Sequence, residues 1–164
     1  MALDLPVPRN VLVHAHWTIN REKMSKSTGN VVNPFFAIDR FGVDVMRFFL
    51  TYQGGLSDDA DYDNEYIIRD YKKMLQWGLG NLTHRIMGIA KWNLQPYVTA
   101  AASDKLPPAT PLDLEHQSFI ETAPAKVAEH MESLDPRSAL REVMAIIEKV
   151  CDIEPCHVLH QVRY

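Results

Sequence analysis

The sequence predicts a mainly α-helical chain with a small β/α segment at its start, because helical periodicity fills most of its length. From residue 64 to residue 91, apolar side chains recur at steps of three and four residues, the pattern of an amphipathic helix. Residues 114–134 and 136–150 show the same spacing. Residues 11–19, by contrast, are rich in β-branched and aromatic side chains and predict a buried strand.

The composition is that of a globular chain of one ordinary domain or two small ones. Of the 164 residues, 46% are hydrophobic and 23% are charged. No run approaches the ~18 apolar residues that a membrane-spanning helix needs, so no membrane contact is expected. The N-terminus carries neither a secretory signal nor a transit peptide, which predicts a cytoplasmic protein if the chain is expressed as it stands. Cys151 and Cys156 lack the partners of a disulfide framework or a zinc site and are expected to be free thiols.

Charge is distributed unevenly along the chain. The net charge is −4, which argues against a generally basic nucleic-acid binder. Residues 1–50 carry 6 basic and 4 acidic side chains, whereas residues 101–164 carry 6 basic and 11 acidic ones. Any contact with a polyanion is therefore expected in residues 1–100.

The predicted strand leads into a short loop that contains two lysines. Its sequence is Lys-Met-Ser-Lys-Ser at residues 23–27, followed by Thr28 and Gly29. Ammonium groups on long stems reach a polyphosphate that moves during a reaction, hydroxyls add donors, and glycine permits close backbone approach. Two lysines at this spacing alone are more often part of a solvated surface turn, so the interpretation depends on the full pentad.

Two short helices are expected after this loop. Asn33 and Pro34 form an N-cap followed by proline at the first helical position, and Gly42 ends that helix. Asp44 is expected to cap the second helix, which includes residues 45–50. Five phenylalanines follow helical spacing beside other apolar residues, so a place in the core is favoured over base stacking for Phe35, Phe36, Phe41, Phe48 and Phe49.

Two polar clusters raise the question of a metal site. Residues 57–63 form an acidic run that lacks the glycine and the terminal glutamate of an EF-hand, so a solvated turn ending in a helix cap at Asp63 is favoured. His14 and His16 share one strand face without a local acidic or thiol ligand, which favours packing or hydrogen bonding over metal binding. No bound metal is predicted in this chain.

The long helix that starts at residue 64 has two features that need an explanation. Gly78 and Gly80 each cost about 1 kcal/mol relative to alanine, and close packing of another element against that face is the expected compensation. Asn81 and Arg85 lie one turn apart and share a face. Without further information, a solvated helix surface is the commoner interpretation of such a pair.

The last part of the chain alternates between helical and irregular patterns. Residues 93–111 contain four prolines and predict a linker or a long surface loop. A kink or break is expected near Pro124, and Asp135 and Pro136 begin the last helix. The helical pattern ends after Val150.

Residues 8–150 resemble the class I methionyl-tRNA synthetases, especially their bacterial-like mitochondrial form. Residues 23–34 (Lys-Met-Ser-Lys-Ser-Thr-Gly-Asn-Val-Val-Asn-Pro) and residues 42–47 (Gly-Val-Asp-Val-Met-Arg) carry part of the resemblance, and variants of both occur in leucyl, valyl and isoleucyl synthetases. Residues 80–85 (Gly-Asn-Leu-Thr-His-Arg), together with the long helix and the acidic run before it, point to methionine.

The resemblance implies a role for the lysine loop and for the long helix. In the complete enzyme, ATP is implied to contact the pentad Lys23, Met24, Ser25, Lys26 and Ser27. Lys23 and Lys26 are the implied catalytic pair, which stabilises the pyrophosphate of ATP as methionine displaces it, and Mg²⁺ would accompany ATP. Asn81 and Arg85 are implied to bind the CAU anticodon of tRNA(Met), because an amide and a guanidinium both recognise unpaired bases.

The resemblance also implies a division of the chain and a location in the cell. Residues 1–62 would be the end of the catalytic body with its stem-contact segment, residues 63–150 an α-helical anticodon-binding domain, and residues 151–164 a divergent tail. The mitochondrial matrix is the location that the mitochondrial form implies.

Several features of the family have no counterpart in these 164 residues. Class I synthetases bind ATP and the amino acid in a Rossmann domain with a HIGH signature, and the sequence contains neither. A tryptophan used in anticodon recognition is also unmatched, because Glu154, Pro155 and Cys156 occupy the equivalent region. The chain is therefore expected to be a C-terminal part of such an enzyme, inactive without the catalytic portion. A non-catalytic tRNA- or partner-binding module and a part of another class I synthetase are the open alternatives.

Overall fold

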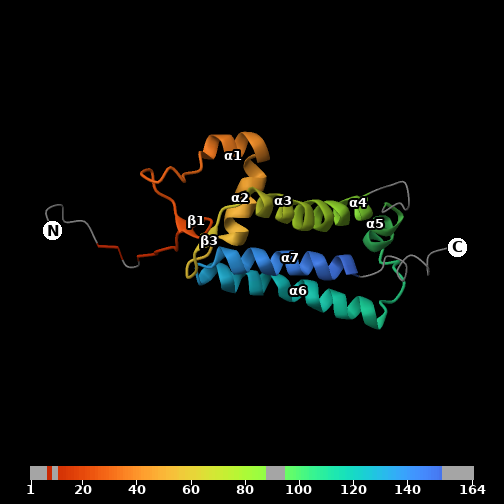
Figure 1. The fold of residues 1–164 in the computed structure, drawn as a ribbon. Coiled ribbons are helices and arrows are strands. Elements are labelled where there is room, and N and C mark those ends of the chain that lie inside the picture. The colour runs from red at the N-terminus through yellow and green to blue at the C-terminus, as the bar shows by residue number, and fades with distance from the viewer. Residues whose placement is uncertain (1–6, 9–10, 88–94, 153–164) are drawn as a thin grey trace.

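The computed structural model describes residues 7–8, 11–87 and 95–152, and the fold is mostly helical with one small sheet (Figure 1). The strands are β1 (Trp17–Ile19), β2 (Glu22–Lys23) and β3 (Ala60–Asp61). The helices, in chain order, are α1 (Pro34–Phe41), α2 (Val43–Gln53), α3 (Asn64–Asp70), the π-helix η1 (Tyr71–Gly80), α4 (Asn81–Met87), α5 (Gln95–Ala102), α6 (Pro111–Glu132) and α7 (Pro136–Asp152). The predicted fold class, mainly α with a small β/α segment, is confirmed.

The helices form a bundle with the sheet at one end. In Figure 1, α3, η1 and α4 follow one another as a continuous rod, and α6 and α7 run beside it in opposite directions. α7 is the central element, because it packs against α2, η1, α4 and α6. Since α2 contacts α7, the segment up to residue 62 and the helical segment after it share an interface, and the domain boundary between them stays a prediction. Within the described ranges, no helix is both long and apolar enough to cross a membrane.

The sheet is much smaller than the predicted strand over residues 11–19. β1 lies between β2, which is antiparallel to it, and β3, which is parallel to it. Val11 and Val13 are 82% and 74% exposed, so the expectation of a buried strand is wrong for its first half. In the described part of this segment, pairing with other strands is confined to β1 and the adjoining carbonyl of His16, and the exposed valines lie before it.

β1 and β2 are joined by a tight hairpin turn. The two turn residues, Asn20 and Arg21, have φ angles of 54° and 63°. Positive φ at both central positions is the geometry of the two-residue turn that matches the twist of paired strands. The turn leads into β2, and the lysine loop begins at Lys23, the last residue of that strand.

The core lies where α1, α2 and α3 meet the sheet. Phe49 and Ile67 are 1% and 0% exposed, and Ala37 and Met46 complete the buried cluster. The ring of Trp17 in β1 lies 5.6 Å from that of Phe49, which ties the strand to the helices.

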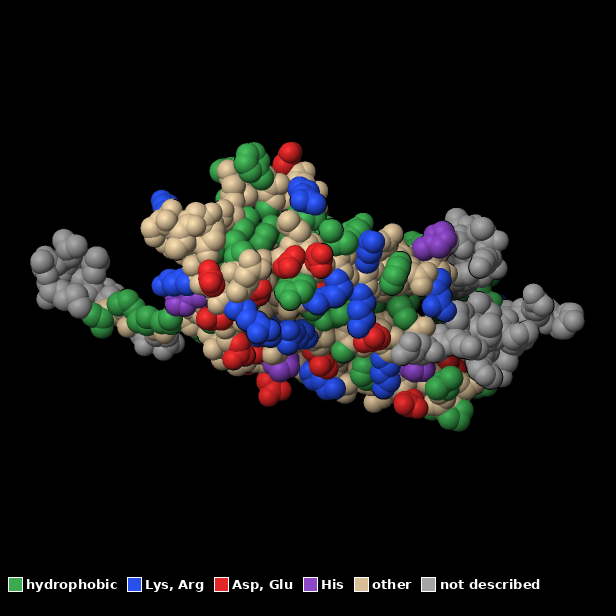
Figure 2. All heavy atoms as spheres, in the orientation of Figure 1, with side chains coloured by type: hydrophobic (Ala, Val, Ile, Leu, Met, Phe, Trp, Pro, Cys, Tyr) green, Lys and Arg blue, Asp and Glu red, His purple; other side chains and the backbone are tan. Residues whose placement is uncertain are grey.

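Two of the phenylalanines predicted to lie in the core are exposed instead. Phe35 and Phe36 are 78% and 74% exposed, and Figure 2 shows apolar side chains on the outer surface of α1. Within the 8 residues of α1, Ala37 is the buried position. Phe35 and Phe36, the two residues before Ala37, lie on the side of the helix that faces away from the core. Phe41 and Phe48 are partly buried.

The predicted limits of the first helix are correct at both ends, whereas the predicted cap of the second helix is wrong. The Asn33 side chain accepts a hydrogen bond from the Phe35 backbone N–H at 2.9 Å, and Gly42, with φ of 85°, ends α1. Asp44 is not a cap, because α2 already begins at Val43 and Gly42 occupies the cap position without a side chain.

The long helix exists, but its middle is a π-helix. η1 covers 10 residues, and its i→i+5 hydrogen bonds place more residues in each turn than an α-helix does. Side chains beyond Tyr71 are therefore rotated away from the face that a period of 3.6 predicts. Leu79 and Ile86, two of the apolar residues in the predicted amphipathic pattern, are 45% and 41% exposed, so neither belongs to a buried stripe. The predicted end at residues 88–91 lies outside the described residues.

The glycine compensation is confirmed for Gly78. A Cβ atom added there would lie 3.8 Å from the Ile147 side chain and 3.9 Å from that of Met144, both on α7. At Gly80 the nearest atom to an added Cβ is the carbonyl oxygen of Leu75, 3.1 Å away in the same helix, so close packing of another element does not explain it.

The second half of the chain is more helical than predicted. Residues 95–102 form α5, where a linker was expected. α6 continues through Pro124 without a break, and a capping box of Thr110 and Asp113 fixes its start. The Ser138 backbone N–H donates to the Asp135 carboxylate at 3.1 Å, which confirms the predicted start of α7.

Candidate functional site

The lysine loop follows β2 and presents both of its lysines to solvent. Lys23 is the last residue of β2 and Lys26 lies in the turn beyond it, and both are exposed. Met24 and Ser25 between them are partly buried. Among the described residues, neither ammonium group forms an ion pair. Both positive charges are therefore available to an external polyanion.

Asn30 holds the loop in shape, a role that the sequence analysis did not identify. Its side-chain oxygen accepts hydrogen bonds from the Ser25 backbone N–H at 2.8 Å and from the Thr28 hydroxyl at 2.7 Å. Its amide nitrogen donates to the Lys23 carbonyl at 3.2 Å. One side chain thus bridges the first residue of the pentad, its middle residue and the threonine that follows it. Asparagine after glycine is a common turn signal, and it was the available clue.

The hydroxyl groups of the loop also bond within it. The Ser25 and Ser27 hydroxyls lie 2.7 Å apart, and the Thr28 hydroxyl donates to the Ser25 carbonyl at 3.0 Å. Gly29 donates its backbone N–H to the same carbonyl at 3.1 Å, and its φ of 73° is a conformation that glycine adopts without strain. The loop is therefore pre-shaped by polar contacts, with the lysine side chains left outside them.

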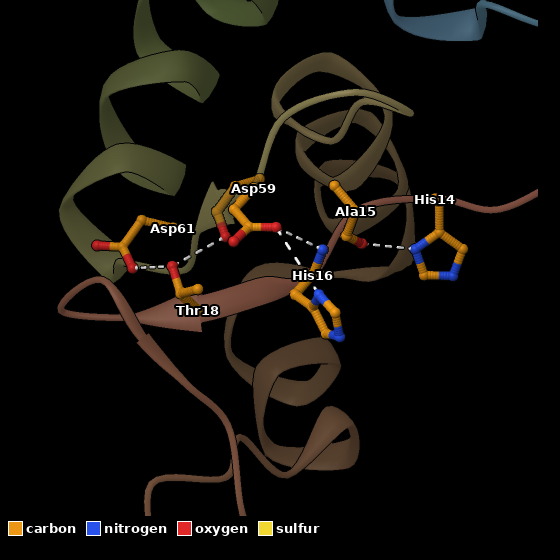
Figure 3. Close-up of polar contacts among 7 residues, drawn as sticks. His14, Ala15, His16, Thr18, Asp59 and Asp61 are labelled. Atoms are coloured by element: carbon orange, nitrogen blue, oxygen red, sulfur yellow. Dashed lines mark hydrogen bonds and ion pairs between the residues drawn. The ribbon is translucent and has the colours of Figure 1, made fainter.

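Carboxylates of the acidic run secure the hairpin that carries the loop (Figure 3). Asp61 accepts from the Thr18 hydroxyl at 2.7 Å and from the Arg21 backbone N–H at 3.0 Å. The hydrogen bond from Thr18, followed by that from Arg21, lowers the pKa of the Asp61 carboxyl below its ordinary value. Asp59 accepts from the His16 backbone N–H at 2.8 Å. The run is thus partly a strand and an anchor, and not only the solvated turn that was predicted.

The structure shows the contacts of the predicted cap, Asp63, and of the two histidines, His14 and His16. Asp63 accepts from the Glu65 backbone N–H at 2.7 Å, which confirms it as the cap of α3. Figure 3 shows His14 bonded to the neighbouring Ala15 carbonyl, at 2.7 Å, and the His16 ring lies 3.9 Å from the Asp59 carboxylate. No group of three potential metal ligands occurs within the described residues.

Asn81 and Arg85 lie on α4, at the far end of the rod from the lysine loop (Figure 1). Asn81 is exposed and is the first residue after the π-helix. Arg85 is only partly exposed, and its guanidinium donates to the Cys151 carbonyl of α7 at 3.3 Å. The interpretation of the pair as a solvated helix surface is therefore incomplete for Arg85, whose side chain reaches α7.

The structure does not bring the two predicted pairs together. The lysine loop projects beside the sheet, whereas α4 lies at the opposite end of the bundle (Figure 1). The face drawn in Figure 2 mixes Lys and Arg side chains with Asp and Glu, so no large surface of one sign joins the two regions on that face. Any shared ligand must be long enough to span the molecule.

Comparison with known proteins assigns the chain to a family. A family profile described as "tRNA synthetases class I (M)" matches residues 1–87, slightly more than half of the chain. The chain belongs to the class I methionyl-tRNA synthetase family. Among its relatives, a probable mitochondrial methionine–tRNA ligase of Neurospora crassa is 40% identical over 153 residues, which cover 90% of this chain and 25% of that protein. The mitochondrial methionine–tRNA ligase of Bos taurus is 33% identical over 151 residues, covering 87% of this chain and 26% of the relative.

A solved structure of this methionyl-tRNA synthetase family has the same fold over most of the chain. The Mycobacterium tuberculosis enzyme in complex with methionyl-adenylate is 25% identical, with a TM-score of 0.74 over 88% of this chain and 27% of that chain. The present chain spans about a quarter of the length of the curated relatives that it matches.

Proposed function

We propose that this chain is the part of a methionine–tRNA ligase that holds the pyrophosphate end of ATP and binds the anticodon of tRNA(Met). The observation that carries the proposal is the placement of two solvent-facing lysines and of the Asn81–Arg85 pair at opposite ends of one packed scaffold, in a chain of this family. The relatives named as mitochondrial support the mitochondrion as its compartment.

The lysine loop supports the ATP-directed half of this proposal. Methionine attacks the α-phosphorus of ATP through its carboxylate, the bond to the bridging oxygen breaks, and pyrophosphate leaves with the developing negative charge. Lys23 and Lys26 would stabilise that charge more strongly in the transition state than in the ground state, which is what raises the rate. Mg²⁺ would enter with ATP as part of the substrate. Met24, Ser25 and Ser27 would contact ATP beside them.

The α4 surface supports the tRNA-directed half. An unpaired base exposes both donors and acceptors on its edge, and the Asn81 amide offers one of each. The guanidinium of Arg85 presents several donors in a rigid fork, and its bond to the Cys151 carbonyl fixes that fork between α4 and α7. A held donor loses less conformational entropy on binding than a mobile one.

Binding of short RNA hairpins tests this half directly. The full 164-residue chain is titrated against a hairpin with CAU in its loop and against one with UAC, at fixed salt. We expect tighter binding of the CAU hairpin, and a loss of about 5- to 150-fold for Asn81→Ala, since a lost base contact is worth roughly 1–3 kcal/mol. Thr83→Ala is the matched control, because Thr83 is exposed on the same helix and its hydroxyl donates to the Leu79 carbonyl one turn earlier. Equal affinity for both hairpins would contradict the proposal.

A second candidate is a tRNA-binding module without catalysis of its own. It is favoured by one observation, the position of Asn81 and Arg85 on α4 at the opposite end of the bundle from the lysine loop, where they could bind RNA without the loop. Methionine-dependent ATP–pyrophosphate exchange separates the two. We expect none from the chain alone, and restored exchange when residues 11–152 replace the matching quarter of the Neurospora crassa ligase. A chimera that folds and binds tRNA without exchange would favour the module.

A further inference from the structure

Arg137, in the first turn of α7, packs against the turn between α2 and β3. A Cβ atom added at Gly55 in that turn would lie 2.5 Å from Nη1 of Arg137 and 3.3 Å from its Cδ. Nη1 of Arg137 also lies 3.9 Å from the Asp58 carboxylate. The arginine therefore occupies the space that a side chain at residue 55 would need, and α7 and the turn fit each other closely.

The contact depends on shape more than on charge. The Asp58 side chain is 79% exposed, and ion pairs of exposed groups contribute little to stability. The Nε–H of Arg137 is buried and has no acceptor among the described residues, so this nitrogen does not hold the side chain either. Arginine stems often pack along a surface and leave the charged end at its edge. We therefore attribute the contact mainly to the packing of the Arg137 stem over Gly55.

Two hollows flank the contact. One has a volume of about 340 Å³ and is lined by Trp17 of β1, and the other has a volume of about 510 Å³ and is lined by Arg141 of α7. Gly55, Asp58 and Arg137 line both. Because there is space on either side of Arg137, a shorter side chain at this position would leave the turn with little support from α7.

Direct contacts lead from this turn to the hairpin that carries the lysine loop. The carboxylate of Asp59 accepts from the His16 backbone N–H at 2.8 Å, as Figure 3 shows, and the Ala60 backbone N–H donates to the His16 carbonyl at 3.0 Å. β1 begins at the next residue and pairs with β2, which ends at Lys23. A displacement of the turn should therefore also displace Lys23.

We propose that Arg137 is a positioning residue for the lysine loop. It supports the turn at residues 54–58, the turn holds the hairpin, and the hairpin sets where Lys23 stands relative to ATP. The inference rests on the proposed function, because it gives a residue of the helical segment a part in the ATP-directed step. A misplacement of about 1 Å, caused far from the reacting atoms, can lower a rate about a hundredfold.

Direct binding of a phosphate by Arg137 fits the surroundings less well. The carboxylates of Asp58 and Asp135 line the same hollow as the guanidinium, so a phosphate there would meet two negative charges. Arg137→Met separates the two roles, because methionine keeps an unbranched, flexible stem and carries no charge.

Amide hydrogen exchange on the full 164-residue chain tests the structural step. In Arg137→Ala, we expect the backbone N–H groups of His16 and Arg21 to exchange about tenfold faster, because the carboxylates that accept from them follow the turn. The N–H of Met46, in the core, should keep its wild-type rate. Equal acceleration at Met46 would indicate general destabilisation and contradict the inference.

Three further variants identify the cause. Gly55→Ala should accelerate the same amides, because its Cβ displaces the guanidinium. Arg137→Met should stay close to wild type, since the packed stem remains, and an effect as large as that of Arg137→Ala would overturn the packing role. Arg141→Ala is the matched control, because Arg141 is an exposed arginine one turn further along α7, with its guanidinium over the Tyr52 ring.

Kinetics of the chimera with the Neurospora crassa ligase test the functional step. Arg137→Ala should lower kcat for ATP–pyrophosphate exchange about tenfold and leave the KM for methionine unchanged. In a Lys23→Ala background, the same substitution should cost about threefold or less, because the lysine that it misplaces is already absent. A full tenfold loss in that background would identify a general structural role and contradict the inference.

The two experiments separate this inference from the proposed function. If Lys23→Ala leaves exchange by the chimera unchanged, the proposed role of the lysine is wrong, whatever Arg137→Ala does to the amides. If Lys23→Ala lowers exchange and Arg137→Ala changes neither the amides nor kcat, the proposed function stands and the inference is wrong. Faster amide exchange with an unchanged kcat would also overturn the inference, because the hairpin would then move without consequence for the reaction.

Discussion

The lysine loop and the helical rod are held in place by different kinds of interaction. In the loop, a single asparagine, Asn30, bridges backbone and side-chain groups from Lys23 to Thr28, and Asp61 secures the hairpin beneath it. The rod instead packs through apolar contacts with α7, made close by Gly78. One region depends on hydrogen bonds at the surface, and the other on complementary shape.

The difference matches what each region is proposed to do. A group that follows a leaving pyrophosphate has to move, and the exposed lysine side chains stay outside the hydrogen bonds that shape the loop. A surface that recognises bases must hold its hydrogen-bond donors in a fixed geometry. Arg85 is held against α7 by its hydrogen bond to the Cys151 carbonyl. Substitutions of polar side chains at the surface should therefore affect the lysine loop, whereas substitutions that change side-chain volume should affect the packing of the rod.

The largest effect is expected from the lysines themselves. In the chimera with the Neurospora crassa ligase, each of Lys23→Ala and Lys26→Ala should lower ATP–pyrophosphate exchange about a hundredfold, since one preorganised charge contact contributes on the order of 3 kcal/mol. The Michaelis constant for methionine should change little, because the lysines face the phosphates. Arg47→Ala, an exposed cation on α2, serves as the control. Near-normal turnover of the double alanine variant would refute the electrostatic role.

The rod should be sensitive to volume at Gly78. Gly78→Leu should lower the free energy of unfolding by about 1–3 kcal/mol, because the added atoms meet Ile147 and Met144. Gly78→Ala is the matched control, and it should be neutral or stabilising by up to about 1 kcal/mol, since its Cβ makes only ordinary contacts. Urea denaturation measures both. Equal stabilities for the two variants would mean that η1 and α7 are not closely packed.

The loop should instead be sensitive to polar changes at Asn30. Asn30→Ala removes three hydrogen bonds and should lower exchange by the chimera about tenfold, through loss of loop order. Asn30→Asp keeps the acceptor for Ser25 and Thr28 and should lose less. The unfolding midpoint of both variants should stay close to that of wild type. An Asn30→Ala enzyme with full exchange activity would show that the loop does not need this bridge.

The smallest effect is expected on stability when the pH is lowered. The pKa of Asp61 is lowered in the folded chain by its hydrogen bonds, chiefly that from Thr18. Its stabilising contribution is therefore complete above the ordinary aspartate pKa of about 3.9 and is lost as pH falls through the lower folded value. The difference in melting temperature between wild type and Asp61→Asn should shrink over that window. A difference that is constant with pH would contradict the assignment.

Local signals in the sequence predicted the helices well and their contacts poorly. The cap at Asn33 and the stop at Gly42 depend on neighbouring residues, so they were predictable. β3 was missed because a two-residue strand in an acidic run exists only through its pairing with β1, more than 40 residues away. The π-helix was missed because the periodicity analysis assumes a fixed number of residues per turn.

The same limit applies to the candidate site. The lysine pentad and the Asn81–Arg85 pair could be found because they form short motifs, and their roles stay predictions. The bridge from Asn30 and the bond from Arg85 to Cys151 depend on how loops and distant helices come together.

A crossed assay on the chimera tests most directly whether the two regions have separate tasks. ATP–pyrophosphate exchange needs no tRNA, whereas aminoacylation needs both ends of the molecule. We predict that Lys26→Ala lowers both activities, and that Asn81→Ala leaves exchange unchanged while aminoacylation of tRNA(Met) falls by about 5- to 150-fold. Loss of exchange in the Asn81→Ala enzyme, or full aminoacylation by it, would contradict the proposed division.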